Sequence, residues 1–197
     1  MPSSKRTDLL DAAERLFVAH GFGAVGIQQV LKEAGVARRT LYLHFASKDE
    51  LVVAVLDRLD QAWRESTSAY VNRSATTPRE RLSAVFAALR ADVGRSEFSG
   101  CVFARAAAEY GAGRRRGVQS HPALAAAVAH QSWIRDWLTQ LATEAGAAQP
   151  QTLALQLGTL FDGAMTCAQT KRCPRALDAA VGAAELLIDT AIDDAQP

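Results

Sequence analysis

Residues 38–48 carry polar side chains that can hydrogen bond to a nucleic acid. This stretch contains two arginines, a threonine, a tyrosine, a histidine and a lysine. Guanidinium, hydroxyl, phenol and imidazole groups contact the phosphate oxygens and base edges that a DNA major groove presents. Leu41 and Phe45 are four residues apart and therefore share one face of a helix. The spacing predicts a short helix that buries Leu41 and Phe45 and exposes its polar face.

A second short helix is expected directly before this one. Residues 27–34 place Val30, Leu31 and Ala34 on one side and polar residues on the other. Gly35 is expected to end this helix in a left-handed cap. Two short helices joined by the turn Ala34-Gly35-Val36-Ala37 form a candidate helix-turn-helix.

The positive charge is concentrated near the N-terminus. The 197 residues carry 22 Lys and Arg against 21 Asp and Glu, a net charge of +1. Residues 1–48 alone hold seven Lys and Arg against four Asp and Glu. Such a local excess favours binding to phosphates, although solvated helices can look similar.

The elements expected to position these side chains are all helical. Helical spacing of apolar residues, glycine breaks and capping signals predict helices over about 7–19, 27–34, 38–45, 47–70, 78–94, 99–110, 121–145, 150–170 and 175–193. The predicted fold is therefore all-α. Three short helices would lie in residues 1–48 and six longer ones in residues 49–197.

Several separated motifs resemble the DNA-binding domain of the TetR family of transcriptional regulators. They are Gly21-Phe22, Ile27, Val30, Ala34-Gly35-Val36, Thr40-Leu41-Tyr42, His44-Phe45 and Lys48-Asp49-Glu50-Leu51. The resemblance covers about residues 5–60 and is loose beyond them. It implies that residues 1–48 form a helix-turn-helix DNA-binding domain and residues 49–197 a six-helix ligand-binding and dimerisation bundle. It also implies that the helix near residues 38–45 is a recognition helix for double-stranded operator DNA.

The resemblance also assigns DNA-contacting residues by position. Those expected to approach bases or the backbone are Gln28, Arg38, Arg39, Thr40, Tyr42, His44 and Lys48. The chain departs from the family pattern at Ala37, where a capping Ser or Thr is usual, at Arg39, which replaces a common glycine, and at Gly26, which replaces a hydroxyl residue. These departures alter the expected operator rather than the fold.

Aromatic residues in the C-terminal two thirds could line an apolar cavity for a small molecule. The predicted ligand-binding residues are Trp63, Phe86, Cys101, Arg105, Trp133, Trp137, Phe161, Asp162 and Met165. The alternative is that the aromatic side chains simply fill the core. A small apolar or aromatic effector that releases the protein from DNA would make the chain a ligand-responsive repressor.

The last two helices could form the interface of a homodimer. Leu153, Leu157 and Leu160 recur beside Gly158 on one helix, and Leu177, Val181, Ala184 and Ile188 recur on the other. Small residues let helices approach closely, which suits a symmetric interface. Packing within one chain is the alternative interpretation.

Other functional classes have weaker support. No phosphate-binding loop or metal-ligand spacing is present, so neither an enzyme nor a cofactor or metal is expected. Cys167 and Cys173 leave open a thiol-based redox-sensing regulator on the same scaffold. A helical interaction module that binds no DNA is a third possibility. The polar start, the three cysteines and the lack of a long apolar stretch predict a cytoplasmic protein that does not bind membranes.

Overall fold

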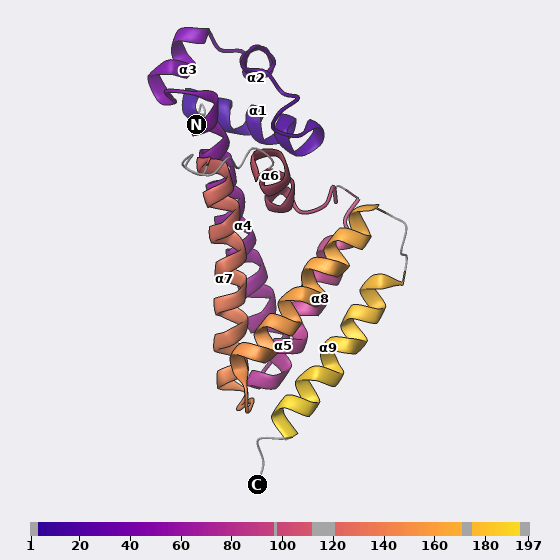
Figure 1. The fold of residues 1–197 in the computed structure, drawn as a ribbon. Coiled ribbons are helices and arrows are strands. Elements are labelled where there is room, and N and C mark those ends of the chain that lie inside the picture. Colours follow the sequence, from indigo (N-terminus) through magenta and orange to yellow (C-terminus); the bar gives the residue numbers. More distant parts are fainter. Residues whose placement is uncertain (1–3, 97, 112–120, 171–174, 194–197) are drawn as a thin grey trace. The chain divides into compact units, whose positions relative to one another are not determined.

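The computed structural model describes residues 4–96, 98–111, 121–170 and 175–193, and within these ranges the regular structure is helical (Figure 1). The helices are α1 (Lys5–His20), α2 (Ile27–Ala34), α3 (Arg38–His44), α4 (Lys48–Ser74), α5 (Pro78–Val93), α6 (Val102–Gly111), α7 (Pro122–Glu144), α8 (Pro150–Thr170) and α9 (Ala176–Asp193). The predicted all-α class is confirmed, and each predicted helix has a counterpart. Helix α6 begins three residues later than expected because Gly100 adopts a φ of +91°, which is outside the helical region.

The helices group into two compact units, and the domain boundary at residue 48 stays a prediction. The first unit contains Met1–Gln61 and Val102–His130, and the second contains Ala62–Cys101 and Gln131–Pro197. The N-terminal half of α4, all of α6 and the start of α7 therefore pack with α1–α3.

The turn between α2 and α3 has the geometry that the sequence predicts. Gly35 lies in the left-handed region at φ 62° and ψ 35°, a conformation that glycine adopts without steric cost. The Val36 N–H donates to the Leu31 carbonyl at 3.2 Å and closes the end of α2. The tight connection fixes α3 against α2.

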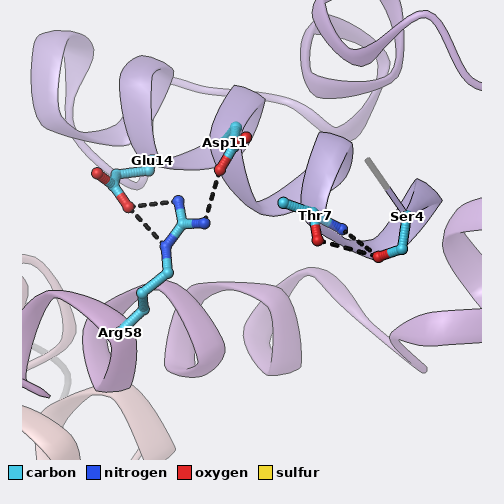
Figure 2. A network of polar contacts seen from close by, with 5 residues as sticks. All are labelled: Ser4, Thr7, Asp11, Glu14 and Arg58. Carbon is cyan, nitrogen blue, oxygen red and sulfur yellow. Dashed lines mark hydrogen bonds and ion pairs between the residues drawn. The ribbon is translucent and has the colours of Figure 1, made fainter. Parts of the chain in front are cut away.

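Helix α4 is joined to α1 by an arginine that contacts two carboxylates (Figure 2). The Arg58 Nε donates to Glu14 Oε2 at 2.8 Å, and its Nη1 donates to Asp11 Oδ1 at 2.7 Å. The Arg58 Nη2 also bonds to Glu14, which makes the contact bidentate. At the start of α1, Ser4 accepts the Thr7 N–H at 3.2 Å and caps the helix.

In the second unit, α5, α7, α8 and α9 share one hydrophobic core. Leu82, Leu138, Leu157 and Ile188 are completely buried in it, and Phe161 lies beside them. On the surface of this unit, the Arg79 guanidinium of α5 contacts two carboxylates of α9.

None of the described helices combines the length and apolar character that crossing a bilayer requires.

Candidate nucleic-acid interface and ligand site

Helix α3 is held in place by the two apolar side chains that the spacing singles out. Leu41 is 0% exposed and Phe45 is 2% exposed. The Arg6 guanidinium lies 5.3 Å from the centre of the Phe45 ring. Ala37 occupies the N-cap of α3 without a side-chain hydrogen bond, as its lack of a hydroxyl requires. Packing, rather than capping, therefore fixes α3.

The opposite face of α3 is open to solvent and polar. Arg38, Arg39, Tyr42 and His44 are exposed, whereas Thr40 is half-buried. The Arg38 Nη2 donates to the Tyr42 hydroxyl at 3.4 Å, and its guanidinium carbon lies 5.6 Å from the centre of the Tyr42 ring. The two side chains therefore form a pair on one flank of α3. Gln28 is exposed on α2 in the same unit.

Sequence reasoning missed one exposed residue of this helix. Leu43 is 72% exposed, more than any other large apolar side chain of the described residues. The sequence does contain a signal for this exposure. Leu43 lies between Tyr42 and His44, two residues from each of the buried residues Leu41 and Phe45.

Lys48 has a structural contact in addition to its predicted role at DNA. Its Nζ donates to the Phe22 carbonyl at 2.6 Å and is partly buried. An ammonium group has three donors, so this bond leaves capacity for a phosphate oxygen. The DNA contact of Lys48 stays a prediction.

Helix α6 contacts the turn that follows α1. The Glu109 carboxylate accepts the Gly23 N–H at 2.6 Å and the Phe22 N–H at 3.3 Å. The Arg105 Nη1 donates to the Val18 carbonyl at 2.7 Å and to the Phe17 carbonyl at 3.4 Å. One α6 side chain therefore bonds to N–H groups of the turn and another to carbonyls at the end of α1.

Two histidines join α4 to the start of α7 within the first unit. The His121 Nε2 lies 3.1 Å from Asp49 Oδ2, and the His121 ring stacks on Tyr110 with centroids 4.1 Å apart. Burial, followed by the charges of Asp49 and Glu109, raises the pKa of Tyr110 to about 12. His130 is buried, and its Nδ1 lies 2.6 Å from Asp60 Oδ1.

Five of the predicted ligand-binding residues meet in the second unit and form an aromatic cluster. These are Trp63, Phe86, Trp133, Trp137 and Phe161. The Trp63 ring lies 6.0 Å from Trp133 and 6.3 Å from Phe161 in edge-to-face contacts. Trp133 stacks on Trp137 with centroids 5.2 Å apart. Phe86 and Phe161 are buried, while the tryptophans are half-buried.

Two cavities lie between described helices of the second unit. The larger, of about 330 Å³, lies between α4 and α5 and is lined by Thr67, Tyr70, Arg73 and Arg95 among others. The smaller, of about 140 Å³, lies between α7 and α8 and includes Asp162. Burial raises the pKa of Asp162. Neither of these cavities is lined by the aromatic cluster.

The remaining predicted ligand residues are dispersed. Met165 packs against the core of the second unit, and Cys101 is half-buried in that unit. Arg105 belongs to the first unit, where it bonds to the α1 carbonyls. Their roles as ligand contacts stay predictions. Within the described ranges, no three His, Cys, Asp or Glu side chains converge as metal ligands do.

This geometry defines a helical protein with an exposed helix-turn-helix, and sequence comparisons agree. The profile of the bacterial regulatory proteins of the tetR family matches residues 9–55. The HTH-type transcriptional repressor KstR2 of Mycolicibacterium smegmatis is 35% identical over 88 residues, covering 44% of this chain and 42% of that protein. The HTH-type transcriptional activator FasR of the same organism is 41% identical over 81 residues, covering 41% of this chain and 36% of that protein. The matched segment thus spans less than half of each relative.

Solved structures extend the similarity to nearly the whole chain. A TetR-family regulator from Streptomyces coelicolor has a TM-score of 0.86 and 30% identity, covering 95% of this chain and 96% of its own. A TetR regulator from Streptomyces avermitilis has a TM-score of 0.78 and 30% identity, with coverage of 96% and 98%. The chain belongs to the TetR family of transcriptional regulators. Family membership confirms the predicted resemblance and places the chain among regulatory proteins rather than enzymes.

Proposed function

We propose that the chain is a transcriptional repressor that reads operator DNA through α3 and is released by a small apolar or aromatic molecule. The observation that carries this proposal is the exposed polar face of α3 above the buried Leu41 and Phe45. A recognition helix must present its side chains to a groove while packing fixes its orientation. The relative KstR2 is named a repressor and FasR an activator, so a reporter gene must test the direction of control.

Residues of α2, α3 and the start of α4 divide the contacts in this proposal. Arg38, Arg39 and Thr40 approach base edges, while Tyr42, His44, Lys48 and Gln28 contact the sugar-phosphate backbone or lie beside it. Arginine forms bidentate hydrogen bonds with guanine O6 and N7, which makes Arg39 the best test of base reading.

The first experiment measures DNA binding by fluorescence anisotropy on duplexes from the chain's own upstream region. Affinity should fall steeply with salt because bound phosphates release counterions. Arg39→Ala should cost about 1–3 kcal/mol on the preferred site and relax base preference at one position. Arg90→Ala is the control, because Arg90 is exposed on α5 and pairs with Asp178 at 2.8 Å. Absence of salt-sensitive binding to any duplex, including a selected random library, would contradict the proposal.

Release from DNA by a ligand requires a link between ligand binding and the DNA-contacting helices α2 and α3. Helix α6 supplies one in this proposal, because Arg105 and Glu109 bond to the end of α1 and the turn after it. A ligand that favours another position of α6 would change these bonds and shift the chain between two conformations. Ligand entry near the aromatic cluster is part of the same proposal.

The ligand experiment uses a compound that copurifies with the chain and is identified by mass spectrometry. Because all three tryptophans of the chain lie in the aromatic cluster, binding there should change the intrinsic fluorescence. Glu109→Gln should keep this fluorescence change but reduce the effect of the compound on operator affinity. Glu144→Gln, on α7 of the second unit, is the control. Unchanged operator affinity at saturating compound would rule out release by that ligand.

We also propose a homodimer through α8 and α9, with a corrected set of contact residues. Leu153, Leu157, Ala184 and Ile188 are buried in the core of their own chain, so they are not available to a partner. Their helices instead expose Leu155 by 60% and Leu186 by 71%. Two copies joined there would present two α3 helices to half-sites roughly 34–36 Å apart.

The thiol-based alternative has less to support it. Cys167 is a half-buried thiol of α8, and Cys173 lies outside the described residues. DNA binding that peroxide leaves unchanged would remove this alternative.

A further inference from the structure

Leu43 is the most exposed large apolar residue that the structure describes in the first unit. Its side chain is 72% exposed, whereas Leu41 is completely buried and Phe45 is 2% exposed. Other large apolar residues of α1–α3, such as Leu9, Phe17 and Val30, are buried. Leu43 therefore contributes little to the fold and is available to a partner.

Helix geometry places Leu43 at the centre of the exposed face of α3. Successive residues of an α-helix are rotated by about 100°, so Leu43 points roughly 180° away from the midpoint of Leu41 and Phe45. Arg39 and Thr40, one turn earlier, flank it on its two sides. If α3 lies in a groove, Leu43 is therefore the residue that faces the groove floor.

The surroundings of Leu43 match DNA rather than an apolar protein surface. Arg38, Arg39 and His44 are exposed on the same short helix, which contains no acidic residue. The face around Leu43 is thus positively charged, and a phosphate-lined groove complements it. On the base-pair edges of a major groove, the apolar group is the C5 methyl of thymine.

We propose that Leu43 is a specificity-determining residue that contacts a thymine methyl group in each operator half-site, beside the base that Arg39 reads. The inference rests on the proposed DNA binding and adds an apolar element to a reading surface otherwise made of hydrogen-bonding groups. It predicts that base preference at one position depends on a methyl group.

The test replaces thymine by deoxyuridine, which lacks only the C5 methyl. Each thymine of the bound operator is replaced in turn, symmetrically in both half-sites, and Kd is measured by fluorescence anisotropy. For the unmodified chain, one replacement should weaken binding roughly fourfold per half-site, as expected for losing one buried methyl group. Leu43→Ala should weaken binding to the thymine operator but show no further loss with deoxyuridine at that position.

Two controls separate this contact from a general effect. Val128→Ala shortens another apolar side chain, one that is 51% exposed on α7 of the first unit, and should keep full sensitivity to deoxyuridine. Arg39→Ala should keep it as well while losing preference at a neighbouring base. Because Leu43 is exposed, Leu43→Ala is expected to fold normally, which its thermal unfolding curve checks.

The outcomes distinguish this inference from the proposed function. Salt-sensitive operator binding that tolerates deoxyuridine at every thymine would overturn the role of Leu43 and leave DNA binding intact. Equal deoxyuridine sensitivity in the Leu43→Ala variant and the unmodified chain would also overturn it. Failure of the unmodified chain to bind any duplex would instead overturn the proposed function.

Discussion

The peptide units on either side of Phe22 are held by charged side chains from two helices. Glu109 of α6 accepts the Phe22 and Gly23 N–H groups, and Lys48 of α4 donates to the Phe22 carbonyl. The Phe22 ring is buried and lies 5.4 Å from Phe17. The turn after α1 is therefore fixed by hydrogen bonds and by packing.

Gly21 permits this arrangement, so its substitution is a direct test. Its φ of 86° and ψ of 166° lie in a region that is nearly restricted to glycine. An added Cβ would also stand 2.7 Å from Glu109 Oε1. Gly21→Ala should lower the free energy of unfolding by about 1–3 kcal/mol, measured by urea denaturation.

The matched control for this prediction is Gly26→Ala. Gly26 has a φ of −88°, and its added Cβ would lie 3.7 Å from Gln29 Oε1, an ordinary contact. Equal stability of Gly21→Ala and the unmodified chain would show that the backbone at Gly21 is not restricted to glycine.

At the scale of single residues, the sequence predicts which side chains are buried better than it predicts which are exposed. Helical spacing predicted that Leu41 and Phe45 are buried, and they are. It did not single out Leu43, because an apolar residue in a short helix is normally interpreted as core. Exposure depends on which neighbours cover a side chain, and spacing alone does not give those neighbours.

At the scale of elements, the helix ends are set by local hydrogen bonds. Thr77 accepts the Glu80 N–H at 3.2 Å, and Glu80 accepts the Thr76 and Thr77 N–H groups at 2.8 and 3.0 Å. Ser47 likewise accepts the Glu50 N–H at 3.1 Å, whereas Glu50 bonds to the Ala46 N–H rather than that of Ser47. Such an arrangement, in which a Ser or Thr before the helix and a Glu three residues later each accept a backbone N–H group, is a capping box. Capping boxes can be recognised in a sequence because all their members are close along the chain.

The capping box formed by Thr77 and Glu80 at the start of α5 predicts that the stability of the fold depends on pH. Backbone N–H groups of Thr77 and Thr76 lower the pKa of Glu80 from 4.5 to about 2. A lowered pKa stabilises the fold above pH 4.5, and the stabilisation is lost as the pH falls towards 2. Thermal unfolding of Glu80→Gln should therefore show a lower Tm than the unmodified chain at pH 6.

This difference in Tm should shrink between about pH 4.5 and 2 as Glu80 becomes protonated. Asp136→Asn, an exposed change on α7 of the same unit, serves as the control. A Tm difference that stays constant from pH 6 to pH 2 would contradict the role of the Glu80 carboxylate.

At the scale of the whole molecule, contacts between distant parts of the chain decide the organisation. The sequence predicts a DNA-binding domain over residues 1–48. Helix α6 packs against this segment as well. Its Arg105 and Glu109 side chains bond to residues that lie 86 to 88 positions earlier in the chain. Periodicity and capping locate helices, but pairings across such separations leave no local pattern, and neither do cavities.

The proposed dimer is the prediction that belongs to this scale. Leu186→Glu places a charge on the exposed face of α9 and should weaken self-association by about tenfold or more, because a symmetric interface buries two such charges. Light scattering coupled to gel filtration should show a shift towards the monomer mass of 21.1 kDa. Val128→Glu, on α7 of the first unit, should not change the mass.

If the unmodified chain already elutes as a monomer across micromolar concentrations, the proposed interface is wrong. If it is a dimer and Leu186→Glu leaves it dimeric, the contact lies elsewhere.

The contacts made by α6 bear on protein engineering. A chimera that transfers only residues 1–48 to another scaffold would omit Arg58, Arg105 and Glu109, three side chains that hold α1 and the turn after it. To transplant the proposed operator recognition intact, the graft must be discontinuous, taking the N-terminal segment through Gln61 together with Val102–His130.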